Sequence, residues 1–305
     1  MQVLTHDDID FSVYMKESDP GEKVRPASEY FTDVMHAISP AFDTPEYPKL
    51  PFADAWLYFA PGEVTIWGGF NNSGKSAIQG QVLAQFALQG QKACIASFEM
   101  KPAKTLARIV KQMTGSAQPH AELVKNLLGQ TDGKLWLYDQ QGTVDKEKMI
   151  AVIRYCAQEL GCQHIAIDSL MKCVKGTDDY NGQKDFVDRL TACARDLNIH
   201  IHLVAHLKKG EGDERMPTRM DISGTGAISD LVDNVILVWR NKKKERDNDS
   251  GKVVQETDPD SVLIVDKQRN GEWEGRVKLW YDKTTLKFTD FNRNRGGLAG
   301  ELRRV

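Results

Sequence analysis

The stretch Gly69-Phe70-Asn71-Asn72-Ser73-Gly74-Lys75-Ser76 decides how the rest of the chain is interpreted. It matches the phosphate-binding loop pattern, in which a glycine and four further residues precede Gly-Lys-Ser/Thr. Such a loop needs a strand before it and a helix after it, because its backbone N–H groups then converge on an anion at the helix N-terminus. Both are predicted here: residues 64–67 are β-prone, and Ile78, Val82 and Phe86 recur at helical spacing. The sequence therefore predicts a site for a nucleoside triphosphate such as ATP.

The loop pattern also assigns a task to its polar residues. Lys75 is expected to reach the outer phosphates, and the Ser76 hydroxyl is expected to coordinate Mg²⁺. The residues expected to contact the nucleotide from the loop and the start of the helix are Gly69, Asn71, Asn72, Ser73, Gly74, Lys75, Ser76 and Ala77.

Length, charge and cysteine content place the chain in a broad class. Its 305 residues can bury a substantial core, and its net charge of −3 argues against general coating of nucleic acid while allowing a local basic site. No apolar run approaches the roughly 20 residues that span a bilayer, so no membrane association is expected. The N-terminus lacks the features of a signal peptide, and the five cysteines are scattered, as is typical of reduced thiols. We expect a cytoplasmic protein, bacterial or in a phage-infected host.

The segment before the loop is expected to be distinct from the rest. Residues 1–28 are polar and acidic with little periodicity, which predicts a loosely held stretch. A helix is predicted next from an apolar stripe at helical spacing, formed by Phe31, Val34, Met35 and Ile38. This helix could pack on its own domain or on a neighbouring copy, and the residues alone do not separate the two. We treat residues 1–49 as a flexible N-terminal segment that carries a linker helix.

From residue 50 to residue 291 the sequence predicts one α/β domain. Strands and helices alternate, which predicts a mostly parallel sheet with helices on both faces, and the last strands are expected to form a hairpin-like antiparallel edge. Two long polar stretches, 208–221 and 241–260, are expected to be functional or disordered loops. Residues 292–305 form a basic tail that is expected to be flexible.

Two carboxylates follow predicted strands. Asp168 ends an apolar strand downstream of the loop, where an acidic residue would share Mg²⁺ with Ser76. Glu99 ends the strand that follows the loop helix, at the sheet edge where ligands of open α/β sheets bind. It could act as the base that activates water, or it could stabilise a helix N-terminus, and its spacing leaves both open.

Several motifs follow the loop in a fixed order. They are Ser97-Phe98-Glu99-Met100, Ile167-Asp168, Ala205-His206-Leu207-Lys208 and Asp221-Ile222-Ser223-Gly224-Thr225-Gly226-Ala227-Ile228. Together, over about residues 50–291, they resemble the RecA-like P-loop NTPase motor of ring-forming replicative DNA helicases, both DnaB-like enzymes and the helicase half of phage primase-helicases. The resemblance implies ATP hydrolysis with Mg²⁺ and translocation along single-stranded DNA in the 5′ to 3′ direction. It further implies a homo-oligomeric, hexameric ring, with a separate primase and a polymerase as partners.

The resemblance also implies roles for individual residues. Glu99 matches the catalytic glutamate, His206 the sensor of the γ-phosphate, and the segment before residue 50 the linker helix that grips a neighbouring subunit. Lys267 and Arg269 match the finger that completes a neighbour's site, and Arg240 and Tyr281 match positions that sandwich the base. The family lines its DNA channel with two loops, here 172–183 and 208–221, whose basic residues include Lys172, Lys175, Lys208, Lys209 and Arg215.

The chain departs from the family pattern in places. Ser229 and Asp230 stand where phage relatives place basic or amide side chains, and Ser223 stands where some carry Arg, so details of coupling to DNA are not carried over. The basic tail differs from acidic polymerase-binding tails, which puts that partnership in doubt. No primase or zinc-binding domain precedes the motor, so priming is expected to come from another chain unless this sequence is a fragment. His200, His202 and His206 have a spacing that could suggest a metal, but no further ligand completes a set, and no metal other than Mg²⁺ is expected.

Two other functions use the same core. A strand-exchange protein of the RecA or RadA type forms filaments, and a helicase loader or regulator binds nucleotide without being a motor. The motifs that contain Glu99 and Asp221 favour the helicase.

Overall fold

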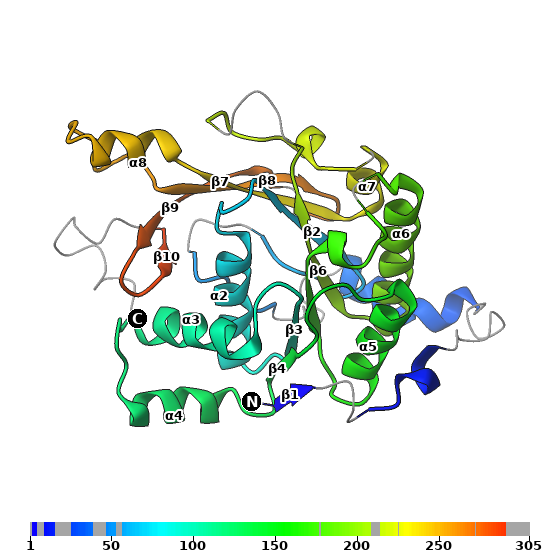
Figure 1. Ribbon diagram of the computed structural model, residues 1–305. Coiled ribbons are helices and arrows are strands. Elements are labelled where there is room, and N and C mark those ends of the chain that lie inside the picture. The colour runs from blue at the N-terminus through cyan, green and yellow to red at the C-terminus, as the bar shows by residue number, and fades with distance from the viewer. Residues whose placement is uncertain are drawn as a thin grey trace.

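The computed structural model describes residues 2–4, 9–15, 26–38, 47–52, 57–176, 178–208, 214–224, 226–271 and 273–290. These residues form a sheet of ten strands in the order β1-β4-β3-β5-β6-β2-β7-β8-β9-β10 (Figure 1). The strands are β1 (Gln2–Leu4), β2 (Val64–Gly69), β3 (Ala93–Ser97), β4 (Leu135–Tyr138), β5 (His164–Asp168), β6 (His200–His206), β7 (Asn234–Arg240), β8 (Ser261–Gln268), β9 (Gly275–Asp282) and β10 (Lys287–Thr289). Pairing is parallel from β1 to β7 and antiparallel from β7 to β10, so the mostly parallel sheet and its antiparallel edge are confirmed.

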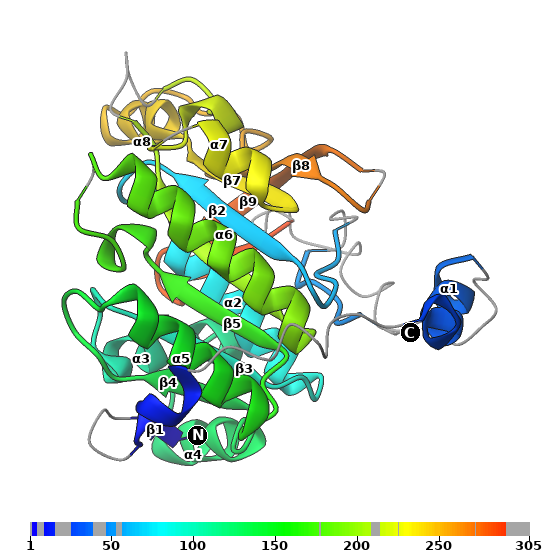
Figure 2. The same ribbon diagram turned by 90° about the vertical axis from the view of Figure 1, so that its right-hand side faces the viewer.

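Helices cover both faces of the sheet (Figure 1). Those described are α1 (Phe31–Ile38), α2 (Lys75–Leu88), α3 (Pro102–Thr114), α4 (Ala121–Gln130), α5 (Lys146–Gln158), α6 (Tyr180–Leu197), α7 (Gly226–Leu231) and α8 (Lys242–Asp249). The sheet separates α5 and α6 from α2 and α3, as two turned views make plain (Figures 1 and 2).

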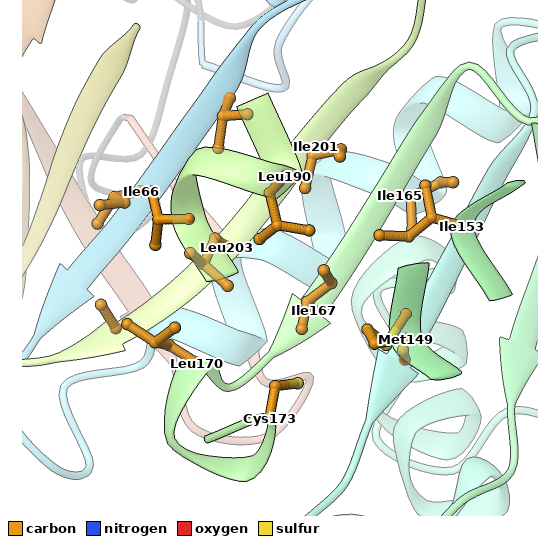
Figure 3. Close-up of a cluster of buried hydrophobic side chains, with 14 of the residues drawn as sticks. Ile66, Met149, Ile153, Ile165, Ile167, Leu170, Cys173, Leu190, Ile201 and Leu203 are labelled. Carbon is orange, nitrogen blue, oxygen red and sulfur yellow. The ribbon is translucent and has the colours of Figure 1, made fainter. Parts of the chain in front are cut away.

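The central strands are apolar on both sides because both faces of the sheet are buried. Along β5, Ile165 and Ile167 point into the core beneath α5 and α6, and Ala166 between them faces the α2 side. Figure 3 shows the first of these cores, in which Met149 of α5 and Leu190 of α6 lie against the strand side chains. The second core includes Ile78, Val82 and Phe86 of α2, all fully buried as their spacing predicted, together with Leu83, Ala84 and Ala87 of the same helix.

The N-terminal segment is partly built into the domain, contrary to expectation. β1 pairs in parallel with β4 at the sheet edge, and a 3-10 helix (Phe11–Met15) packs on α5. Phe11 is buried there and makes edge-to-face contacts with Tyr138 and Tyr155. A three-residue strand and one anchoring aromatic leave no periodic signal, which is why the sequence did not reveal them.

The helix predicted from the apolar stripe is present as α1. Phe31 and Val34 on that stripe are 64% and 49% exposed, and α1 stands away from the sheet in Figure 2. The side chain of Ile38 and the proline expected to end the helix lie outside the described residues. A large part of the stripe is therefore uncovered in the single chain.

The polar stretch 241–260 is not a loop throughout, since it contains α8. Asn241 starts this helix by accepting a hydrogen bond from the Lys244 backbone N–H at 3.0 Å. Helix α8 has no apolar stripe, so the hydrophobic pattern could not predict it. Residues 209–213 of the other polar stretch lie outside the described part of the chain.

Two expectations from composition can be compared with the structure. All five cysteines are buried free thiols, and burial raises the pKa of Cys173 to about 12 and that of Cys193 to about 11. Among the residues that the structure describes, no helix combines the length and the apolarity needed to cross a bilayer.

Candidate nucleotide site

The phosphate loop connects β2 to α2 at the carboxyl end of the parallel strands. Gly74 has a φ of 98° and precedes the helix, and Asn72 has a φ of 61°, so the loop turns through the left-handed region twice. No side chain caps the first turn of α2 and that turn carries no acidic residue, which leaves its N–H groups available to an anion. Gly69 permits the tight path, because a Cβ there would meet the Ser73 hydroxyl at 2.5 Å and the Val238 carbonyl at 2.8 Å.

Lys75 lies folded over this loop. Its ammonium donates hydrogen bonds to the carbonyls of Gly69 at 2.8 Å and Phe70 at 2.9 Å, and the residue is 6% exposed. Burial lowers its pKa to about 8, although the nearby charges of Asp168 and Glu99 favour the protonated form. A buried cation bonded to two backbone carbonyls is suited to exchange them for phosphate oxygens.

Ser76 and Asp168 meet as the sequence predicted. The Ser76 hydroxyl is close enough to the Asp168 carboxylate to favour its charged form, and Asp168 is buried at the end of β5. Burial raises the pKa of Asp168, while Ser76, Lys75 and Arg108 act in the opposite direction. One carboxylate and one hydroxyl beside a phosphate loop are the hard oxygen donors that Mg²⁺ prefers, so the residues present fit this ion.

Glu99 and His206 lie at the same sheet edge. Glu99 follows β3 and His206 ends β6, and the charge of Glu99 acts on Lys75, Asp168 and His206. The Glu99 side chain is 51% exposed, and one of its oxygens lies 3.7 Å from the Lys172 ammonium. Burial lowers the pKa of His206, whose Nε2 lies 3.5 Å from the Ser169 hydroxyl. The spacing argument left the role of Glu99 open, and the structure shows it half-exposed among the phosphate-site charges.

The two residues expected to sandwich the nucleotide base lie on β7 and β9, where the sheet becomes antiparallel. Arg240 donates hydrogen bonds to the Asn72 carbonyl at 3.0 Å and to Glu245 at 2.6 Å, so it touches the loop directly. Tyr281 packs against Phe288 with ring centroids 4.7 Å apart, and the charge of Arg240 acts on Tyr281. The structure therefore brings Arg240 and Tyr281 to the phosphate loop.

Sequence reasoning missed several residues around the site. Arg108 of α3 donates a hydrogen bond to the Ser76 carbonyl at 3.0 Å, and Gln112 binds the carbonyls of Ala77 and Leu286. Arg108 and Gln112 are four residues apart, so they share one helix face, and two long polar side chains on a face with buried residues were the available signal.

Gln81 and Phe288 form a second missed group. The buried Gln81 amide donates to the Phe288 carbonyl at 2.8 Å and accepts from its N–H at 2.9 Å. The Phe288 ring in turn lies against Gly74, at 3.1 Å from the position of a Cβ on that glycine. Strand β10 is thus fixed against the phosphate loop through contacts that no local pattern shows.

Lys267 and Arg269 lie at the opposite end of the strands from the phosphate loop, near the start of β7. Lys267 pairs with Val235 at the start of β7, and Arg269 bonds the backbone of Asp233 just before it. In the pairing of β2 with β7, Asp233 lies opposite Val64, which is five residues before Gly69. The distance along β2 from Val64 to the phosphate loop is therefore about 17 Å. The structure therefore does not bring these cations to the phosphate loop of their own chain.

Both cations make contacts within their chain. The Lys267 ammonium donates to the carbonyls of Ser229, Asp230 and Val232, which matches the number of donors it has. Arg269 donates to Asp233 at 3.0 Å and to the Asp230 carbonyl at 2.9 Å, and its side chain is 40% exposed. The departures at Ser229 and Asp230 thus lie where the last turn of α7 accepts both cations.

The predicted DNA-contacting residues differ in their surroundings. Lys175 and Lys208 are exposed, Lys172 lies beside Glu99, and Arg215 is paired with Asp221 at 2.5 Å. Lys209 lies outside the described residues.

His200 and His202 point into the core with His164, and His206 lies apart at the phosphate site. The His202 Nε2 is 3.3 Å from His164 Nδ1, and Trp67 donates to the other nitrogen of His202 at 3.3 Å. Within the described part of the chain, no group of His, Cys, Asp and Glu has the arrangement of a metal site.

The strand order, the loop and the residues around it define a RecA-like P-loop ATPase core. Over residues 54–290 the chain matches the DnaB-like helicase C terminal domain, so it belongs to that family. Two solved structures share the fold. One is described as a DnaB-like replicative helicase with its interactions with primase; it has a TM-score of 0.68 at 14% identity, covering 87% of this chain and 67% of that one. The other is the ATPase domain of G40P, with a TM-score of 0.73 at 15% identity, covering 88% and 99%.

Curated relatives are longer than this chain. It is 24% identical over 210 residues to the DNA helicase/primase of Enterobacteria phage T3, covering 61% of this chain and 37% of that protein. It is 26% identical over 293 residues to the Twinkle homolog protein, chloroplastic/mitochondrial, of Arabidopsis thaliana, covering 85% and 39%. The chain thus spans less than two fifths of the length of either relative.

Proposed function

We propose that the chain is an ATP-driven DNA helicase motor that forms a ring on single-stranded DNA and hydrolyses ATP between subunits. The observation that carries this proposal is the separation of charges across the sheet. The carboxyl ends of the parallel strands carry Lys75, Asp168, Glu99 and His206. The cation Arg269 lies at the opposite ends of these strands. In a head-to-tail ring, different faces of neighbouring subunits meet, so the end of one subunit that carries Arg269 would face the nucleotide site of the next subunit.

Within one subunit, Lys75 and the N–H groups of α2 would bind the phosphates. Ser76 and Asp168 would hold Mg²⁺, which supplies charge neutralisation at the phosphate oxygens. Arg240 and Tyr281 would flank the base. Phe288, packed under Tyr281 and against Gly74, would fix that side relative to the loop.

Glu99 would orient water and accept its proton, because its carboxylate is half-exposed beside the phosphate site. Lys172 is its nearest cation and belongs to the first predicted DNA loop, so its position supports a link between DNA and the water-activating group. His206, neutral because burial lowers its pKa, would bond the γ-phosphate as a neutral donor.

The finger is assigned to Arg269 and not to Lys267. Arg269 keeps further N–H donors on a guanidinium that is 40% exposed, whereas the Lys267 ammonium is matched by three carbonyls of its own chain. Lys267 would support the finger by holding the end of α7.

The first experiment is an unwinding assay on forked duplexes with the purified chain alone. We expect ATP-dependent unwinding that requires a 5′ single-stranded tail, and DNA-stimulated ATP hydrolysis. Lys75→Ala should abolish both by weakening nucleotide binding, and Glu99→Gln should abolish both while nucleotide still binds. Turnover that persists undiminished in either variant would contradict the site assignment, and hydrolysis without unwinding would favour a loader or a filament-forming protein.

The second experiment tests the shared site by mixing subunits. Arg269→Ala should bind nucleotide normally and fail to hydrolyse it. When mixed with Lys75→Ala, intact fingers of one variant meet intact phosphate loops of the other, and part of the activity should return. A mixture as inactive as its components would argue against hydrolysis between subunits.

The third experiment tests α1 as the linker that grips a neighbour. Val34→Asp places a charge on its exposed apolar stripe and should shift the protein from ring to smaller species in light scattering. Val253→Asp is the matched control, because Val253 is fully exposed outside any helix and should leave the assembly unchanged. Equal behaviour of the two variants would remove α1 from the interface.

A further inference from the structure

The carboxylate of Asp233 lies between the proposed finger and the strand that carries the phosphate loop. Asp233 is 5% exposed on its side chain and comes immediately before β7. One oxygen accepts a hydrogen bond from Arg269 at 3.0 Å, and the other accepts from the Val64 N–H at 3.0 Å. Arg195 contributes a second guanidinium, 3.9 Å from the same oxygen that binds Arg269.

The backbone repeats both links. The Asp233 N–H donates to the Val64 carbonyl at 3.0 Å, and the Arg269 N–H donates to the Asp233 carbonyl at 3.0 Å. Three chain segments therefore meet at Asp233 through both main chain and side chain. A buried carboxylate bonded to a guanidinium is a charge-assisted contact with fixed geometry, because the guanidinium is planar and its donors cannot rotate independently.

The guanidinium of Arg269 is bonded at both terminal nitrogens and is still partly exposed. Asp233 takes one terminal nitrogen and the Asp230 carbonyl takes the other, and the side chain is still 40% exposed. Such a cation is oriented before any anion arrives, so little rotamer entropy remains to be lost when it binds one.

Val64 connects this contact to the phosphate loop through strand β2. It is the first residue of β2, and Gly69 at the other end of β2 opens the phosphate loop, about 17 Å away. The same strand therefore ends in a subunit's own phosphate loop and begins at the group that holds its finger.

We propose that Asp233 is a positioning residue that orients Arg269 for the neighbouring subunit's nucleotide and ties that finger to strand β2. This rests on the proposed function, in which Arg269 acts between subunits. Asp233 does not touch nucleotide; it acts through Arg269.

Glu63 provides a matched control. It is similarly buried, at 5% exposed against 3% for Asp233, and lines the same cavity of about 540 Å³ as Asp233 and Arg269. Its oxygens accept hydrogen bonds from Asn234 at 2.9 Å and from Asn270 at 2.6 Å, whereas the Arg269 side chain donates to Asp233 and to the Asp230 carbonyl. Glu63→Gln thus disturbs a neighbouring buried carboxylate without releasing the finger.

The experiment compares Asp233→Asn with Glu63→Gln in the full chain. Asp233→Asn should bind a fluorescent ATP analogue with unchanged affinity and lower the kcat of DNA-stimulated hydrolysis by about tenfold or more, with KM changed less than about twofold. Glu63→Gln should keep kcat near the unmodified value. Equal losses in both variants, or an unchanged kcat in Asp233→Asn, would overturn the proposal.

Subunit mixing then separates positioning from a general loss of structure. Mixed with Lys75→Ala, Asp233→Asn should regain activity, because its intact phosphate loop receives a well-oriented finger from its partner. Mixed with Arg269→Ala it should regain none, since both changes affect the finger. If Arg269→Ala is rescued by Lys75→Ala and Asp233→Asn is not, this inference fails while the proposed function stands. If neither is rescued, the proposed function fails first.

Asp233→Glu covers the case in which Asp233→Asn does not fold. It keeps the charge and displaces the carboxylate by one methylene, so we expect a smaller loss of kcat and the same pattern of rescue. A loss of kcat that Lys75→Ala does not rescue would overturn the proposal in this variant also.

Discussion

Three buried histidines, His164 of β5 and His200 and His202 of β6, should make the protein unstable in mild acid. Burial lowers the pKa of His164 to about 4 and that of His200 to about 3, and the pKa of His202 falls well below its ordinary value. Their nitrogens contact Thr65, Trp67 and the Ala60 carbonyl, and His164 contacts His202. Within the described part of the chain, no acidic side chain acts to raise the pKa of any of the three. The native protein therefore keeps these rings neutral.

The sign and size of the effect follow from linkage. The unfolded chain binds protons on histidine near pH 6.5, and the native chain binds them only nearer pH 4, so stability is intact above about 6.5 and falls as the pH decreases below it. For His164 the free energy of unfolding should decrease by about 2 kcal/mol between pH 7 and pH 5. His200, whose pKa falls to about 3, adds a similar amount, and His202 acts in the same direction. The sum of about 4 kcal/mol from His164 and His200 is a large part of the whole stability of many domains.

Urea unfolding followed by circular dichroism at pH 7, 6 and 5 measures this decrease. Groups such as Glu63 and Asp168, whose pKa is raised by burial, act in the opposite direction, so a variant is needed to isolate the histidines. His164→Leu should reduce the difference in the free energy of unfolding between pH 7 and pH 5 by about 2 kcal/mol relative to the unmodified protein. Any pH-independent effect of the substitution on stability cancels in this difference. An unmodified pH dependence in His164→Leu would refute the reasoning.

Three further predictions concern the site. Gly69→Ala should remove ATP binding in a fluorescence titration, because its Cβ would lie 2.5 Å from the Ser73 hydroxyl, and retained affinity would contradict the tight path of the loop. Gln81→Leu leaves both backbone groups of Phe288 unpaired and should lower the free energy of unfolding by about 2–3 kcal/mol, as urea titration can check; a change below about 0.5 kcal/mol would mean that other contacts hold β10. Lys208→Ala should weaken single-stranded DNA binding and reduce the slope of log affinity against log salt by about 0.7, and an unchanged slope would remove it from the phosphate contacts.

The sequence predicted the central α/β core well because that core follows local rules. The buried strands read as apolar runs, the helices between them repeat at helical spacing, and Pro102 and Gly115 mark the two ends of α3. Glu99 was placed at the carboxyl ends of the strands by its position after a strand, Asp168 by the Mg²⁺ that it would share with Ser76, and His206 by the family resemblance.

What could not be predicted depends on contacts between distant segments. Phe11 and β1 join the sheet edge through pairing with residues more than a hundred positions later, and β10 reaches the phosphate loop through Gln81. Arg108 lies on a helix whose pattern shows only that one face is buried, and not that this face meets Ser76. The contacts of Lys267 with α7 likewise depend on the antiparallel turn back toward β7.

The contact between Gln81 and Phe288 has a consequence for how the protein is made. The two residues are 207 positions apart, so the phosphate loop is synthesised long before the strand that packs against it. At about 5–20 residues per second, that interval is about 10–40 s on the ribosome. During this time the nascent loop has its glycines, Lys75 and Ser76 but no Phe288 beside Gly74. A chain released before β10 should therefore carry the complete motif and still bind ATP poorly, so nucleotide affinity can serve as a check on whether the last strand has docked.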